Sequence, residues 1–183
     1  RFGHRLPLSM SDDDAAVLSQ ENGKVVHEAW VDSLVFELRW NLALTHADDV
    51  DATEHLAPVP GAIPNSTRIT YQPMGAVTII VPFNWPIAIL GAALPHALLS
   101  GNTVIVKPSS VTPATTLLFD DLFRDAGFPE GAYATGLLSF DQVAPYIADS
   151  RVRGVTLTGS NKAGARIGEQ PGRALKPAPL EAA

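Results

Sequence analysis

The chain has 183 residues, of which 46% are hydrophobic and 17% charged, as in a globular protein of one domain or slightly more. Its net charge of −6, without a Lys/Arg cluster, argues against a nucleic-acid-binding surface. The absence of cysteine excludes disulfides, thiolate metal sites and a thiol nucleophile among these residues, and it favours a cytoplasmic location. No signal peptide or membrane span is expected, because the apolar stretches are too short.

The first part of the chain is predicted to be helical. Residues 11–20 begin with a serine that can cap a helix and three aspartates that suit its positive end, and Gly23 ends this pattern. Residues 24–47 repeat apolar side chains at helical spacing, which predicts a long amphipathic helix. Trp30 and Trp40 lie on this helix, and both are expected to pack in the core.

A Pro/Gly-rich stretch at 57–66 reads as a linker, and the alternating residues 67–73 as an exposed strand. From residue 75 onward, apolar runs alternate with helical stretches. Strands are expected at 75–82, 103–107, 131–137 and 153–159, and helices at 86–101, 113–127, 140–149 and 162–170. This alternation predicts an α/β fold, a Rossmann-like parallel sheet with helices on both faces.

Polar residues follow two of the predicted strands, at the edge where parallel sheets bind ligands. Asn84, in VPFNWP, can donate its amide to an oxyanion, or can bond its own backbone in a turn. Lys107 closes the next strand; its ammonium is either solvated or held near the edge by Pro108, within reach of nucleotide hydroxyls or phosphates. Ser109 and Ser110 add hydroxyl donors there, or else cap the following helix.

A third strand ends in TGSNKAG, where Gly159 and Ser160 open a strand-to-helix turn. Exposed amides at a helix start suit a diphosphate, although glycines in such turns are also common without any ligand. The three strand ends together predict a nucleotide site.

The motifs VPFNWP, GNTVIVKPSSVTP, LFRDAGFPEG and VTLTGS, in this order, resemble the aldehyde dehydrogenase superfamily. ENGK upstream and LKPAPLE near the end fit as well, so the resemblance covers nearly the whole chain. LFRDAGFPEG and the following SFDQVAPYIADSRVRGVTLTGS are most similar to the bacterial succinate-semialdehyde dehydrogenase branch. The resemblance implies NAD(P)-dependent oxidation of an aldehyde, with succinic semialdehyde as a candidate, to a carboxylic acid through a thioester.

The resemblance also implies roles for catalytic positions. Asn84 matches the oxyanion-hole asparagine, and Glu181 matches the glutamate general base, whose motif usually reads Leu-Glu-Leu-Gly-Gly. Pro82, Phe83 and Trp85 would line the site beside Asn84 as cofactor-binding residues.

For the cofactor, the resemblance places Lys107 at the adenosine ribose and Gly159 and Ser160 under the diphosphate, with Ser109 and Ser110 next to Lys107. Many NAD-preferring relatives carry at the Ser110 position a glutamate that would repel a 2′-phosphate. Because serine removes that charge, we expect NADP to be accepted and preferred, with NAD as the alternative cofactor.

The chain departs from the family in lacking the cysteine nucleophile, and Glu181 is followed by two alanines where Leu-Gly is usual. We therefore expect the first part of a dehydrogenase, truncated before its catalytic domain and inactive alone. A stand-alone nucleotide-binding protein and an inert remnant are the alternatives. No histidine spacing supports a metal site.

Three parts are expected: a helical segment (1–58), a linker with an exposed oligomerisation-type strand (59–74) and a partial NAD(P)-binding domain (75–183). The resemblance implies a homo-oligomer for the complete protein, with a small aldehyde as substrate and with neither nucleic acid nor a membrane as partner. The isolated chain is expected to self-associate through uncovered apolar edges. Arg39, on the long helix, either meets a carboxylate substrate or lies on a solvated face.

Overall fold

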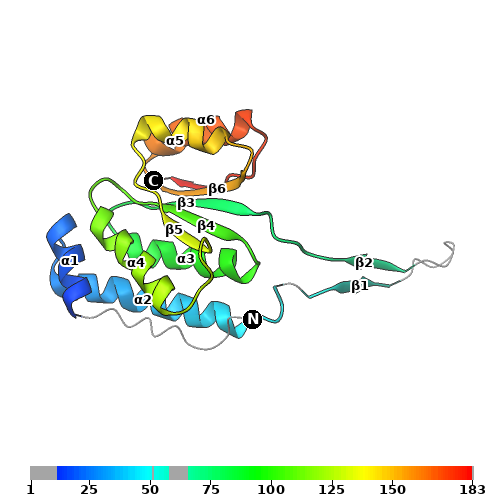
Figure 1. The fold of residues 1–183 in the computed structure, drawn as a ribbon, viewed down its shortest axis with the longest axis horizontal. Helices are drawn as coiled ribbons and strands as arrows, with labels where there is room; N and C mark the ends of the chain where they lie inside the picture. The colour runs from blue at the N-terminus through cyan, green and yellow to red at the C-terminus, as the bar shows by residue number, and fades with distance from the viewer. Residues whose placement is uncertain (1–11, 51, 58–65, 183) are drawn as a thin grey trace.

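The computed structural model describes residues 12–50, 52–57 and 66–182, and Figure 1 shows their arrangement. The helices are α1 Asp12–Asn22, α2 Val26–Thr45, α3 Pro86–Leu99, α4 Pro113–Asp125, α5 Phe140–Ala148 and α6 Asn161–Arg173. The strands are β1 Glu54–Leu56, β2 Thr67–Ile69, β3 Ala76–Ile80, β4 Thr103–Lys107, β5 Tyr133–Thr135, β6 Val152–Gly159 and β7 Leu180–Ala182.

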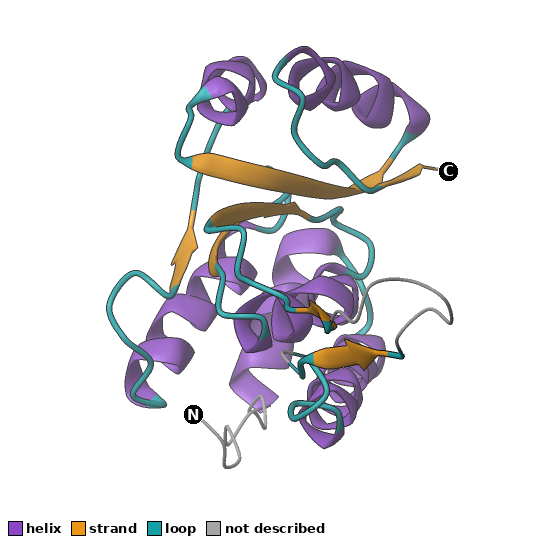
Figure 2. Cartoon of the chain, turned by 90° about the vertical axis from the view of Figure 1, so that its right-hand side faces the viewer, coloured by secondary structure: helices purple, strands orange, loops and turns teal. Residues whose placement is uncertain are grey.

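Five strands form one parallel sheet in the order β5-β4-β3-β6-β7. Helices α1 to α4 lie on one face of this sheet, and α5 and α6 cover the other (Figures 1 and 2). The predicted α/β class is therefore confirmed. β7 had not been predicted as a strand, because it is only three residues long and follows two prolines.

Alternating side chains of the strands build two separate hydrophobic cores. On β3, Ile79 packs with α1 to α4, whereas Ile80 packs with α5 and α6. The first core contains a run of aromatic contacts from Phe36 and Trp40 of α2 to Phe123 of α4. The N-terminal helices thus share a core with the sheet.

Helices α3 and α4 both begin with a proline, and neither receives a side-chain cap from its own N-cap residue. Carboxylates from the N-terminal helices replace those caps. Asp32 of α2 accepts a bond from the Ala88 amide at 2.6 Å, and Glu21 of α1 accepts from the Ala114 amide at 2.7 Å. Each carboxylate lies at the positive end of the helix that it caps, so it fixes the loop that leads into that helix.

The exposed face of α2 differs from the prediction. Trp40 is buried as expected, but Trp30 is 45% exposed. The exposed apolar residues at four-residue spacing are Val26, Trp30, Leu34, Leu38 and Leu42. The helix instead turns its Asp32 and Phe36 side toward α3, because Asp32 caps that helix and the glycine at position 91 admits the Phe36 ring.

Strands β1 and β2 form a separate antiparallel pair that extends away from the sheet (Figure 1). All residues of both strands are exposed, as expected for β2, whereas β1 had not been predicted. The proposed serine cap at residue 11 and most of the predicted linker lie outside the described residues. No helix of the described part is both long and apolar enough to span a membrane.

Candidate functional site

The register of the sheet brings the predicted strand ends to one edge. Ile80, the last residue of β3, pairs with Lys107 of β4 and with Leu157 of β6. Thr158 in turn pairs with Glu181 of β7. Because all these strands are parallel, the loops that follow them open on the same side, here called the C-terminal edge.

Lys107 is half-buried at this edge, and its side-chain ammonium has no hydrogen bond or ion pair with any described residue. Burial lowers the pKa of its amine below the ordinary value for lysine, because the charged form loses hydration. An anionic group placed beside it would restore the charge that burial disfavours.

Of the two serines after Lys107, one has a hydrogen-bonded hydroxyl. The Ser109 hydroxyl accepts a bond from the Val111 amide at 3.2 Å. Ser110 is exposed, and its hydroxyl bonds to no described residue. Neither serine caps α4, since Glu21 performs that role, so the capping alternative is wrong.

Ser160 is the N-cap of α6, and its hydroxyl accepts from the Ala163 amide at 3.3 Å. The amides of Asn161 and Lys162 have no partner within the described part of the chain. The turn after Gly159 therefore presents free backbone donors at a helix start, at the same edge as Lys107.

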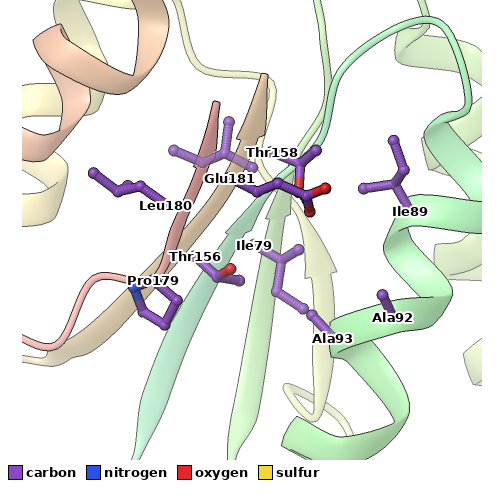
Figure 3. A pocket seen from close by; sticks show the side chains of 10 residues that line it. Ile79, Ile89, Ala92, Ala93, Thr156, Thr158, Pro179, Leu180 and Glu181 are labelled. Atoms are coloured by element: carbon purple, nitrogen blue, oxygen red, sulfur yellow. The ribbon is translucent and has the colours of Figure 1, made fainter. Parts of the chain in front are cut away.

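Glu181 lies on the α3 side of the sheet, in a groove of about 260 Å³ between α3 and strands β6 and β7. Figure 3 shows its carboxylate pointing from β7 toward α3, whose Ile89 and Ala93 form the apolar wall opposite. Among the described residues its hydrogen-bond partner is the Thr158 hydroxyl, which donates at 3.4 Å, a long bond. The carboxylate therefore remains accessible to another proton donor.

The loop after β3 holds Pro82, Phe83 and Asn84. Pro82 is half-buried, Phe83 is 51% exposed, and Asn84 is exposed without a hydrogen bond to any described residue. The alternative in which the Asn84 amide bonds its own backbone is therefore not observed. The following Trp85 is half-buried, and the Lys24 ammonium lies 3.7 Å from the centre of its ring.

Arg39 is exposed on α2, as the alternative of a solvated face expects. One of its guanidinium nitrogens donates to the Ala88 carbonyl at the start of α3. Within the described residues, no three His, Cys, Asp or Glu side chains come together as metal ligands.

A model of the aldehyde dehydrogenase family matches residues 8–183 of this sequence. The chain belongs to the aldehyde dehydrogenase family. It is 36% identical to an aldehyde dehydrogenase of Paenarthrobacter nicotinovorans over 94% of the chain, and 33% identical to a succinate-semialdehyde dehydrogenase [NADP(+)] of Deinococcus radiodurans over 99%. It spans 38% and 37% of the lengths of these two relatives.

Among solved structures, the fold resembles a succinic semialdehyde dehydrogenase from Streptococcus pyogenes in complex with NADP+. The TM-score is 0.87 at 29% identity, over 93% of this chain and 37% of that one. This aldehyde dehydrogenase chain therefore corresponds to a little over a third of the proteins it resembles.

Sequence reasoning missed three residues that surround the Asn84 loop. Asn22, Lys24 and Asp32 come from α1, α2 and their connection, about sixty residues before that loop in the sequence. The ENGK motif was the available signal, but its spacing alone does not indicate what it contacts.

Proposed function

We propose that this chain forms the cofactor-binding part of an NADP-dependent aldehyde dehydrogenase, with succinic semialdehyde as the candidate substrate. The supporting observation is the register of the parallel sheet, in which the loops carrying Asn84, Lys107, Ser160 and Glu181 share one edge. The named relatives in Deinococcus radiodurans and Streptococcus pyogenes support both the substrate class and the cofactor. The lack of cysteine supports a cytoplasmic location as part of this proposal.

The residues at the edge fit an NADP molecule in two respects. Lys107 offers a cation without a partner among the described residues, and Ser110, in the loop that follows it, offers a free hydroxyl. Both groups suit a ribose carrying a 2′-phosphate. The free amides of Asn161 and Lys162 suit the diphosphate. Bound there, the nicotinamide would supply the acceptor for the hydride that leaves when an aldehyde becomes an acid.

Two residues of this chain have proposed catalytic roles. The Asn84 amide donates a hydrogen bond to the aldehyde oxygen, which gains negative charge when a nucleophile adds to the carbonyl carbon. Glu181 removes a proton from the water that releases the acid. The thiol that a thioester route requires is not among the 183 residues.

Kinetics of the protein as its source makes it test these roles. Asn84→Ala is expected to lower kcat for aldehyde oxidation by about 10²- to 10³-fold. Glu181→Gln is expected to retain a burst of NADPH formation and to lose steady turnover, because only acid release needs the base. Unchanged turnover in both variants would remove Asn84 and Glu181 from the mechanism.

For the 183 residues alone, the absence of cysteine favours a second proposal, which is nucleotide binding without aldehyde oxidation. NADPH titration of the isolated chain tests it. Saturable binding without NADPH production from aldehyde and NADP+ is the expected result, and no binding would leave an inert segment.

A further inference from the structure

The connection between α1 and α2 contacts the loop that carries Asn84. The Asn22 side-chain amide donates to the Phe83 carbonyl at 2.9 Å, across 61 residues of sequence. The side-chain oxygen Oδ1 of Asn22 meanwhile accepts from the backbone amide of Lys24 at 3.0 Å, which fixes the orientation of the Asn22 side chain. Asn22 therefore joins its own turn to the residue directly before Asn84.

Lys24 holds the other side of that loop. Its ammonium lies over the Trp85 ring and bonds the Asp32 carboxylate at 3.2 Å. The Lys24 side chain is only 7% exposed, and that of Asp32 is fully buried. Since water is excluded, these charges are held in one arrangement. The second Asp32 oxygen accepts from the Ala88 amide, so the same carboxylate also fixes the start of α3.

Asn84 itself has no hydrogen bond to any residue that the structure describes. Its two neighbours are held instead: Asn22 bonds the backbone carbonyl of the residue before it, and Lys24 lies over the ring of the residue after it. An exposed amide between two held residues is the arrangement that a preorganised hydrogen-bond donor requires.

We propose that Asn22 and Lys24, supported by Asp32, are positioning residues that hold the Phe83–Trp85 loop and thereby aim the Asn84 amide. This inference rests on the proposed role of Asn84 in aldehyde oxidation. The three residues touch neither substrate nor cofactor in the proposal, and they act through the loop.

Glu21, the neighbour of Asn22, provides a matched control. Its carboxylate bonds the Ala114 and Thr115 amides and the Thr115 hydroxyl, at 2.6 to 2.8 Å, and so holds the start of α4. Glu21 and Asn22 are thus adjacent but contact different segments. Asn22 holds the loop that contains Asn84, and Glu21 holds the start of α4.

The direct test is ¹⁵N NMR relaxation on the labelled chain, which gives a backbone order parameter for each residue. Asn22→Asp keeps the oxygen that bonds Lys24 but removes the donor to Phe83, and should lower the order parameters of residues 83–85 from the rigid value of about 0.85 toward about 0.6. Glu21→Gln should lower the order parameters of Ala114 and Thr115 and leave those of residues 83–85 at the parent values. Equal loosening of both segments by either variant, or no change at 83–85 in Asn22→Asp, would overturn the proposal.

Lys24 is tested by loss and rescue. Lys24→Met should move the indole N–H signal of Trp85 and loosen residues 83–85, whereas Lys24→Arg should restore both, because a guanidinium also stacks on an indole ring. Circular dichroism identifies any variant that fails to fold. If a Lys24 variant fails to fold, Asn22→Asp alone decides whether these contacts hold the loop. Failure of arginine to restore the Trp85 signal would contradict the role of the charge.

Kinetics of the active protein separate this inference from the proposed function. Asn22→Asp should lower kcat about three- to tenfold with the aldehyde KM within twofold, and should have no further effect in an Asn84→Ala background. Additive losses would show that Asn22 does not act through Asn84. If Asn84→Ala leaves kcat unchanged, the proposed function fails, while the order parameters of residues 83–85 still decide whether Asn22 holds the loop.

Discussion

At the residue scale, cofactor choice is proposed to depend on one position beside Lys107. Ser110→Glu should weaken NADP+ binding about tenfold or more and leave NAD+ binding nearly unchanged, because a carboxylate repels the 2′-phosphate. Ser150→Glu, in the turn before β6 at the opposite edge of the sheet, adds the same charge and serves as the control. Isothermal titration measures both ligands, and a parallel loss of NAD+ and NADP+ affinity in Ser110→Glu would contradict the assignment.

Lys107 also predicts a pH dependence. Its pKa in the fold lies below the value of 10.5 for an ordinary lysine, so the unfolded chain binds more protons between these two pKa values. Its contribution to stability should therefore increase as the pH rises through this window, and it should be smallest and constant below it. An NADP+ phosphate beside Lys107 should raise the pKa again. NMR titration of the lysine side chain with and without NADP+ checks this; an unchanged pKa on binding would place the ligand elsewhere.

At the element scale, the glycines of α6 separate helix propensity from packing. Gly172 has open space around it, so Gly172→Ala should stabilise the chain by about 0.5 to 1 kcal/mol. A Cβ at Gly164 would lie 3.1 Å from the Cβ of Ala182, next to Glu181. Gly164→Ala should gain less or destabilise, because β7 must move. Urea unfolding of the two variants gives the comparison, and equal gains would mean that α6 does not restrict β7.

The alternation of apolar runs and helical stretches was sufficient to predict four of the five parallel strands, β3 to β6, and the helices α3 to α6 that follow them. The same alternation also predicted that the residues at the strand ends lie at one edge, since a parallel sheet brings such ends together. It did not predict which side of α2 is buried, because the deciding contacts, Asp32 with Ala88 and Phe36 beside Gly91, join segments far apart in the sequence. The same reason explains why the partners of Asn22 and Lys24 were not anticipated.

At the scale of the whole molecule, large apolar side chains remain exposed on α2 and on the β1–β2 pair, among them Trp30, Leu38, Leu56 and Ile69. We propose that the β1–β2 pair contacts another copy of the chain. Its second strand, β2, is the exposed oligomerisation-type strand of the 59–74 part. The isolated chain should therefore self-associate. Light scattering after size exclusion tests this, and a monomer of 19.4 kDa would contradict it. Leu56→Lys should reduce the association.

The division of the chain into a helical segment (1–58), a linker with its strand (59–74) and a cofactor domain (75–183) remains a proposal. The central claim concerns the last part, whose C-terminal edge is proposed to bind NADP.

The most direct measurement is a titration of the ¹⁵N-labelled chain with NADP+ and with NAD+, followed by NMR. The proposal predicts saturable shifts centred on Lys107, Ser110, Gly159 and Ser160, with a lower Kd for NADP+. Shifts elsewhere, or none at these residues, would contradict the claim that the C-terminal edge of the sheet is a dinucleotide site.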